Sequence, residues 1–374
     1  MKIGTIKGIG IKIHLSTLLI VGLVGFYAAS FYISINNNAP FIEIFTVGLL
    51  NGLIILISIL IHELSHSIMA QRYGLEVKEI ELYIFGGVSK IEEEPKTPNS
   101  EMLITFVGPL SSLLTGGILL IINLLPLSAP ALISFTLFYS GISNIGLGIF
   151  NLLPAFPIDG GRILRALLWK RRNNLISATR TASNVGVIVG YGLIVYGIFQ
   201  IFTLGFINGL WLILMGSFLN SSARQSYTQT VNDVALSSIT AKEIVNLPNF
   251  KIPFEINILE ALRSYFFPYK KSYFPVVQDY KIVGLVHIED IKKIPIEQRS
   301  NIIIGYVMRK ISEFPYVNID DTGKEVMKKL RKSGKKPYIG IVRERENGAL
   351  IGFIAEEDLI SSLKFWDLNQ KNLN

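Results

Sequence analysis

Six long apolar segments constrain the fold of this 374-residue chain most strongly. A helix needs about 20 apolar residues to cross the hydrocarbon core of a bilayer. The segments of about this length are 13–35, 44–72, 101–125, 130–153, 182–202 and 205–222. The basic start, 1–14, shows no small-residue cleavage site before the first segment, so we expect a retained span. The sequence therefore predicts a polytopic α-helical membrane protein with six transmembrane helices.

The distribution of positive charge predicts how these spans are oriented. An even number of spans puts both termini on one side of the membrane. The connections on the opposite side, 35–43, 125–131 and 202–208, contain no Lys or Arg, whereas the segments on the side of the termini are rich in both. The positive-inside rule then predicts a multi-pass protein of the cell membrane with both termini in the cytoplasm. The net charge of +8 forms no basic stripe interleaved with aromatic residues, so we expect no nucleic-acid partner.

A change in composition near 221–232 separates the apolar part of the chain from a charged tail. The tail contains an internal repeat, because GLVHIED at 284–290 is followed by GFIAEED at 352–358. Each unit has the pattern of a helix, two apolar strands and a short helix, which predicts an α/β module that occurs twice. The predicted domains are a membrane domain, a linker, a first repeat and a second repeat, at 1–222, 223–234, 235–298 and 299–374.

A small β element is predicted between the second and third spans. Residues 77–84 partly alternate between apolar and polar, and FGGV follows at 85–88. Alternation of this kind is typical of a strand or small hairpin, and paired glycines permit a sharp bend or a close approach of another backbone. An ordinary reverse turn is the alternative interpretation.

The second span contains the motif HELSH at 62–66. Positions i and i+4 share one face of a helix, so the His62 and His66 imidazoles can reach one zinc ion, and Glu63 can take a proton from activated water. The alternative interpretation is a chance match, because on a charged soluble helix the same motif means only a solvated face. Here it follows the apolar run 53–61, where ionisable groups are costly and need a partner. A metal ion supplies that partner.

The third ligand is expected to be a carboxylate. A catalytic zinc ion has three protein ligands and one open position, and this chain contains no Cys. The other two histidines are His287, in the tail repeat, and His14, near the cytoplasmic end of the first span. Asp159 lies in NLLPAFPIDGGR (151–162), where the prolines interrupt helix and irregular backbone at membrane depth must be buried or line a watery cavity. We therefore expect this segment to aim Asp159 at the metal.

Two alternatives apply to this segment. Asp159 and the glycine after it can also form an ordinary turn in a cytoplasmic loop. Asn151 is a candidate donor to the substrate or to the developing oxyanion, and the alternative is an asparagine that ends a helix.

Together these motifs resemble the site-2 protease family of intramembrane metalloproteases, over roughly 1–222. HELSH in a second span is paired with an Asn-x-x-Pro-x-x-x-x-Asp-Gly pattern, and FGGV at 85–88 and GPL at 108–110 also look like segments of that family. The resemblance implies one zinc ion per chain held by His62, His66 and Asp159, with Glu63 as general base. It also implies regulated intramembrane proteolysis of transmembrane protein substrates in the lipid bilayer.

The same resemblance bears on how substrate is selected and held. Residues 73–100 are too few for the PDZ domain that many relatives carry after the second span, so selection of pre-cut substrates by such a domain is not expected. We expect an unwound substrate to add as a strand to the edge of 77–84.

The tail is similar to a pair of CBS domains, a regulatory module that often binds adenine nucleotides. The resemblance implies ATP, ADP or AMP between the repeats, with Asp290 and Asp358 at the ribose. His287 and Ala355 replace the usual Ser or Thr of that motif. The alternative is a structural module without ligand, or one that forms a homodimer.

A different class of protein also fits the spans and the tail. In a CBS-regulated ion channel or transporter, the same His and Asp residues would line an ion pathway. That alternative explains less well why Glu63 lies between histidines at the spacing of zinc peptidases.

Overall fold

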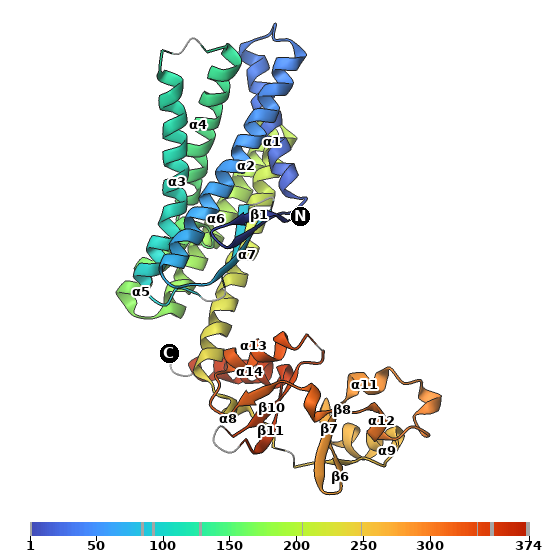
Figure 1. The fold of residues 1–374 in the computed structure, drawn as a ribbon. Helices are drawn as coiled ribbons and strands as arrows, with labels where there is room; N and C mark the ends of the chain where they lie inside the picture. Colours follow the sequence, from blue (N-terminus) through green and yellow to red (C-terminus); the bar gives the residue numbers. More distant parts are fainter. Residues whose placement is uncertain are drawn as a thin grey trace. The chain divides into compact units, whose positions relative to one another are not determined.

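The computed structural model of the chain describes residues 2–83, 86–91, 94–126, 129–203, 205–247, 249–334, 336–344 and 348–371 (Figure 1). These residues form two compact units, 1–228 and 229–374.

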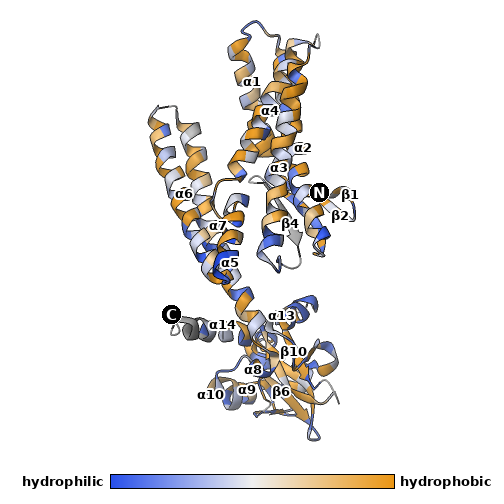
Figure 2. Ribbon diagram, turned by 90° about the vertical axis from the view of Figure 1, so that its left-hand side faces the viewer, coloured by the Kyte–Doolittle hydropathy of each residue, from blue (hydrophilic) through white to orange (hydrophobic). Residues whose placement is uncertain are grey.

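Unit 1 consists of seven helices and a small sheet in the described ranges, with α7 continuing into unit 2. The helices are α1 (Thr17–Ile35), α2 (Phe41–Arg72), α3 (Pro98–Leu124), α4 (Ala131–Asn151), α5 (Asp159–Arg172), α6 (Leu175–Thr203) and α7 (Phe206–Ser238). Five of them, α1, α2, α3, α4 and α6, are long and apolar enough to cross a membrane. Figure 2 shows their predominantly apolar colour. The predicted class, a polytopic helical membrane protein with a small β element and an α/β tail, is confirmed.

The sixth predicted segment, 205–222, lies mainly within the first half of α7. Helix α7 packs closely against α6, since a Cβ at Gly197 would lie 2.7 Å from the carbonyl oxygen of Gly209. Small residues of this kind allow two membrane helices to approach each other. A sixth crossing stays a prediction.

The sheet of unit 1 contains two strands that the sequence analysis missed. Its order is β1 (Lys2–Ile6), β2 (Ile9–Ile13), β3 (Val77–Tyr83) and β4 (Gly86–Ile91). The N-terminal hairpin β1–β2 pairs in parallel with β3, and β4 pairs antiparallel on the other side of β3. Buried side chains of the sheet, among them Ile9, Ile80 and Leu82, pack with Ile55 and Ile59 of α2.

This topology corrects the expectation that 77–84 offers a free edge. Strand β3 is hydrogen-bonded on both sides, so the edge strand next to it is β4. The error arose because the pairing of β2 with β3 joins segments that are far apart in sequence. Ile84 and Phe85, which belong to the predicted β element, lie outside the described residues.

Unit 2 contains two sheets with short helices. The first sheet has the order β5 (Ile252–Pro253), β6 (Tyr273–Gln278), β7 (Lys281–His287) and β8 (Arg309–Lys310), and the second β11 (Leu350–Ala355), β10 (Ile339–Arg343) and β9 (Tyr316–Asn318). The helices of unit 2 are α8 (Ala241–Ile244), α9 (Ile258–Ala261), α10 (Phe267–Tyr269), α11 (Ile288–Lys292), α12 (Ile304–Val307), α13 (Gly323–Lys332) and α14 (Glu356–Lys371). A π-helix covers Leu262–Phe266.

The chain reaches the second repeat before it enters the first. Leu236 at the end of α7 and Ile244 of α8 are buried in one core with Val326 and Ile354 of the second repeat. Residues 223–234, the predicted linker, are helical. The predicted domain bounds themselves stay a prediction.

Candidate metal centre

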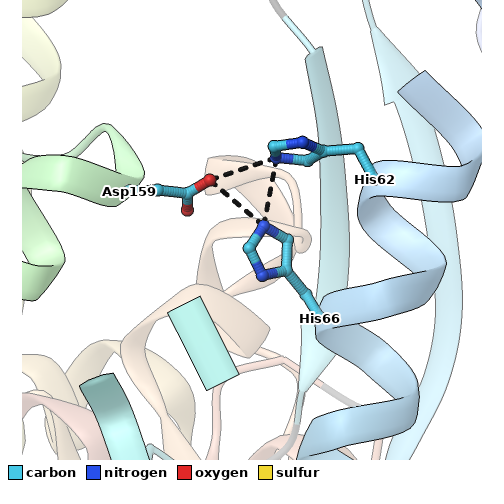
Figure 3. A group of neighbouring side chains, drawn as sticks. All are labelled: His62, His66 and Asp159. Atoms are coloured by element: carbon cyan, nitrogen blue, oxygen red, sulfur yellow. Dashed lines mark hydrogen bonds and ion pairs between the residues drawn. The ribbon is translucent and has the colours of Figure 1, made fainter. Parts of the chain in front are cut away.

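Helix α2 presents the two histidines of the HELSH motif on one buried face. His62 and His66 are 5% and 6% exposed, and Ile59 and Ile55 are buried about one and two turns before His62. This is the i, i+4 geometry that the motif predicts. Figure 3 shows both imidazoles extending from α2 towards Asp159.

Three donor atoms meet at this point. Nε2 of His62 and Nε2 of His66 are each 3.1 Å from Oδ2 of Asp159, and the two Nε2 atoms are 3.1 Å apart (Figure 3). Four ligands around a zinc ion at about 2.0–2.1 Å would be about 3.3 Å from one another. The triangle therefore has the size that a tetrahedral zinc ion requires, with a fourth position left for water or substrate.

The other ring nitrogens fix the orientation of the imidazoles. Nδ1 of His66 donates to the carbonyl oxygen of Ile104 at 2.8 Å, and Nδ1 of His62 is 2.9 Å from Oγ of Ser112. An Nδ1–H that is donated in this way leaves the lone pair on Nε2, the form that binds a metal. Two buried lone pairs facing a carboxylate repel one another unless a cation lies between them. The donor set thus fits a divalent zinc ion.

Helix α3 backs both histidines. A Cβ at Gly108 would overlap Nε2 and Cε1 of His66 and would lie 2.9 Å from Nε2 of His62. Gly108 therefore permits α3 to come close enough for Ile104 and Ser112 to reach the rings.

Asp159 begins α5, directly after the irregular segment 152–158. Its side chain is 12% exposed. A Cβ at Gly161 would overlap the backbone of Phe156, so the first turn of α5 folds tightly back onto that segment. The structure thus has the irregular, helix-breaking geometry that the prolines predict.

A buried ion pair anchors α5 to α3. Nε of Arg165 donates to Oε1 of Glu101 at 2.7 Å, its Nη2 contacts the same oxygen, and the guanidinium lies 4.9 Å from the centre of the Phe156 ring. Glu101 is 1% and Arg165 is 4% exposed. The sequence analysis did not predict this ion pair, because a partner on another helix could not be recognised from the sequence.

Glu63 lies against the edge strand. It is half-buried, and a Cβ at Gly87 of β4 would overlap its side chain. The glycine of the FGGV segment thus allows the strand to pass close to the carboxylate. This juxtaposition was not foreseen, although the sequence indicated a close approach at these glycines.

The remaining predicted site residues are not brought to this cluster by any described hydrogen bond. Nδ2 of Asn151 donates to the carbonyl oxygen of Leu147 at 2.9 Å. In unit 2, Oδ2 of Asp358 is 3.0 Å from the Tyr273 hydroxyl, and Asp290 pairs with Arg309.

Comparisons with known proteins show what this chain is similar to. The family model "Peptidase family M50" matches residues 52–131 and 126–197, and "CBS domain" matches 304–364. Zinc metalloprotease MJ0392 of Methanocaldococcus jannaschii is 29% identical over 373 residues, which cover 99% of this chain and 98% of that protein. Stage IV sporulation protein FB of Bacillus subtilis is 32% identical over 140 residues, or 35% of this chain and 47% of that protein. A solved site-2 protease from M. jannaschii is 30% identical, with a TM-score of 0.43 and coverage of 60% of this chain and 94% of its own.

The close approach of α3 predicts a specific effect of a single methyl group. Gly108→Ala should lower zinc affinity by roughly 10- to 100-fold, because the added Cβ displaces the rings or the helix that orients them. Gly117→Ala on the same helix is the matched control, since a Cβ there meets nothing within 4 Å. Zinc retained during titration with a chelator measures the difference. Equal retention by the two variants would contradict the role of Gly108.

The buried ion pair predicts a large cost when one partner is removed. Glu101→Gln removes the carboxylate that the buried Arg165 guanidinium contacts, which should destabilise the protein by about 3–5 kcal/mol. Arg162→Gln is the control, because Nε of Arg162 is 3.9 Å from Glu101 and its side chain is more exposed, at 25%. Thermal unfolding in detergent compares them. A Glu101→Gln protein as stable as the control would show that the pair does not anchor α5.

Proposed function

Because the chain belongs to peptidase family M50, the site-2 protease family of zinc metalloproteases, we propose that it cleaves transmembrane helices of partner proteins. The chain is a multi-pass membrane protein and a site-2-type metalloprotease. This family membership favours the protease over the channel or transporter. The observation that carries the proposal is the triangle of His62, His66 and Asp159, with its three donor atoms 3.1 Å apart.

In this proposal His62, His66 and Asp159 are the protein ligands of one zinc ion per chain. When bound, the zinc ion supplies a Lewis acid that activates water and polarises the peptide carbonyl. Glu63 is the general base: its carboxylate accepts a proton from the attacking water and returns it to the leaving amine nitrogen. Ser112 and the Ile104 carbonyl hold the imidazoles in orientation through their Nδ1 atoms.

The edge strand β4 suggests how an unwound substrate is held. A helical peptide bond is shielded, so the substrate must become extended before it can react. A segment that adds to β4 as a further strand would gain main-chain hydrogen bonds there. Gly87 of β4 touches Glu63, so this arrangement would bring the extended segment beside the general base. Asn151 stays a proposed donor to the substrate, from the last position of α4.

We also propose that the CBS pair binds an adenine nucleotide that regulates cleavage. A cavity of about 580 Å³ between the repeats is lined by His287, Ala355 and Glu357, among others. Nδ1 of His287 accepts from the backbone N–H of Glu289 at 3.0 Å, so the neutral ring carries its proton on Nε2. That Nε2–H is buried, lies 3.8 Å from Oε1 of Glu357 and makes no hydrogen bond within the described part of the chain, so it can donate to an acceptor such as a phosphate oxygen.

The two motif aspartates, Asp290 and Asp358, already have partners within the CBS pair. Asp290 already pairs with Arg309 at 3.1 Å and with Lys293 at 2.8 Å. Burial raises the pKa of Asp358, which accepts from the Tyr273 hydroxyl. A ribose would have to replace these partners. Cytoplasmic termini and a homodimer through the CBS pair also stay proposals.

The general-base assignment predicts that metal binding and activity can be separated. Glu63→Gln should retain one zinc ion per chain, yet cleave a membrane-spanning reporter roughly 10²- to 10⁴-fold more slowly. Ser65→Ala lies in the same motif and should cleave normally, because the hydrogen bond of the Ser65 hydroxyl within the described residues goes to the carbonyl oxygen of Ile61 in its own helix. Metal analysis and a reporter assay in detergent give both values. Full activity of the Glu63→Gln protein would rule out this role.

The regulatory proposal predicts heat in calorimetric titration of the full-length protein with ATP, ADP or AMP. His287→Leu should weaken the response, since it removes the Nε2–H donor from the cavity. The control is Lys281→Gln, an exposed change on the same strand. If none of the three nucleotides produced heat with the unaltered protein, regulation by adenine nucleotide would be excluded.

A further inference from the structure

Helix α5 ends in a group of cations that the catalytic proposal does not use. Lys170, Arg171 and Arg172 form its last turn, and Arg180 follows on α6. All four side chains are exposed. Nη1 of Arg172 donates to Oγ1 of Thr181 at 2.7 Å, which brings the end of α5 beside the turn of α6 that carries Arg180. We call these four residues the α5 cation cluster.

Within the described residues, the α5 cation cluster has no ion pair with a carboxylate. In the ranges that the structure describes, no ion pair joins Lys170, Arg171 or Arg180 to an acidic residue. Arg165, which lies earlier on the same helix, differs from these residues because it is buried and forms an ion pair with Glu101. Surface cations that lack a protein anion are available to an anion from outside the chain.

The helix that carries the cluster also presents an apolar surface. Leu167 is 50% exposed, and Ile163 precedes it by one helical turn on the same face. Lys170 and Arg171 follow on that face, at three and four residues after Leu167. Apolar residues followed by cations on one face are typical of a helix at the boundary between acyl chains and headgroups.

The position of α5 in unit 1 places this surface at the end of the membrane helices. Figure 1 shows α5 at the end of the bundle where α2 ends and α3 and α6 begin. In Figure 2 the hydrophilic turns of α5 lie next to the apolar length of α6. The cations need an anion, and their position beside apolar helices favours an anion of the bilayer over a soluble one.

We propose that the α5 cation cluster binds the headgroup of an anionic phospholipid. Lys170, Arg171 and Arg180 would contact the phosphate, and Leu167 would lie against the acyl chain. Arg172 holds the two helices together through Thr181 and Ser177. Because α5 starts with Asp159, a lipid held at its other end would restrain the helix that supplies the carboxylate. Asp159 and Lys170 are about 16 Å apart along the helix axis.

Trp169 provides a local probe of this site, since it precedes Lys170 directly. The full-length protein with Trp211→Phe and Trp366→Phe retains Trp169 as its one tryptophan, because the chain has three. It would be reconstituted in phosphatidylcholine vesicles that contain either brominated phosphatidylglycerol or the same amount of brominated phosphatidylcholine. Quenching of Trp169 by the anionic lipid should exceed quenching by the zwitterionic lipid.

The test variant is Lys170→Gln/Arg171→Gln/Arg180→Gln in the same background. Each removed cation should reduce the preference for the anionic lipid by about fivefold. The control, Lys251→Gln/Lys281→Gln/Lys332→Gln, removes the same charge from exposed positions of unit 2 and should leave the preference unchanged. The readout needs no proteolysis, so it is independent of the proposed function.

Three outcomes would overturn the proposal. The first is equal quenching of Trp169 by both brominated lipids, and the second is an unchanged preference in the test variant. The third is a preference that inorganic phosphate or an oligonucleotide abolishes at constant ionic strength, which would assign the cluster to a soluble anion or to a nucleic acid.

Discussion

Two imidazole nitrogens and one carboxylate oxygen face one another where α2 and α5 pack against α3. Each atom is 3.1 Å from the other two, and the side chains that carry them are 6%, 8% and 12% exposed. Lone pairs and negative charge cannot be packed together in a poorly solvated site without a cation between them. The rest of unit 1 is arranged so that these three atoms meet. Helix α2 must present two rings on one face, and the chain after α4 must break so that α5 can start at Asp159.

Helix α3 connects the two halves of this centre. Towards α2 it offers the Ile104 carbonyl and the Ser112 hydroxyl, which orient the rings, and Gly108, which leaves them room. Towards α5 it offers Glu101, which pairs with Arg165. One helix thus supports both histidines and the helix that carries the carboxylate. This explains why Glu101, Gly108 and Ser112 occur on its buried face.

The chemistry of the centre could be predicted because it depends on local spacing. HELSH fixes two rings on one helical face, and the prolines before Asp159 require a break in the helix wherever the segment lies. The sequence analysis also expected Asp159 at the same metal, because the chain has no Cys and its other two histidines lie elsewhere, and the resemblance implies the same pairing. Support from Glu101 and Gly108 could not be predicted, because a buried ion pair and a close helix contact depend on which helices become neighbours.

In the sheet and the tail, too, contacts between distant segments could not be predicted from the sequence. The alternating pattern at 77–84 predicted a strand, and β3 lies there, but the pairing of β2 with β3 is non-local and left no signal in the pattern. The repeat in the tail predicted two modules. It gave no indication that Leu236 and Ile244 would enter the core of the second repeat. Local periodicity predicts which segments form helices and strands. Which strand lies at the edge of a sheet, and which segments pack together, depends on tertiary contacts.

The central claim is that one zinc ion is held by two imidazoles from α2 and a carboxylate from α5. X-ray absorption at the zinc edge of the purified full-length protein tests it most directly, because the spectrum reports the atoms that surround the metal. The account predicts one zinc ion per chain with two imidazole nitrogens and light oxygen ligands at about 2.0–2.1 Å. Asp159→Ala should remove one oxygen ligand and retain both imidazoles. A shell without two imidazoles, or one that is unchanged in the Asp159→Ala protein, would contradict it.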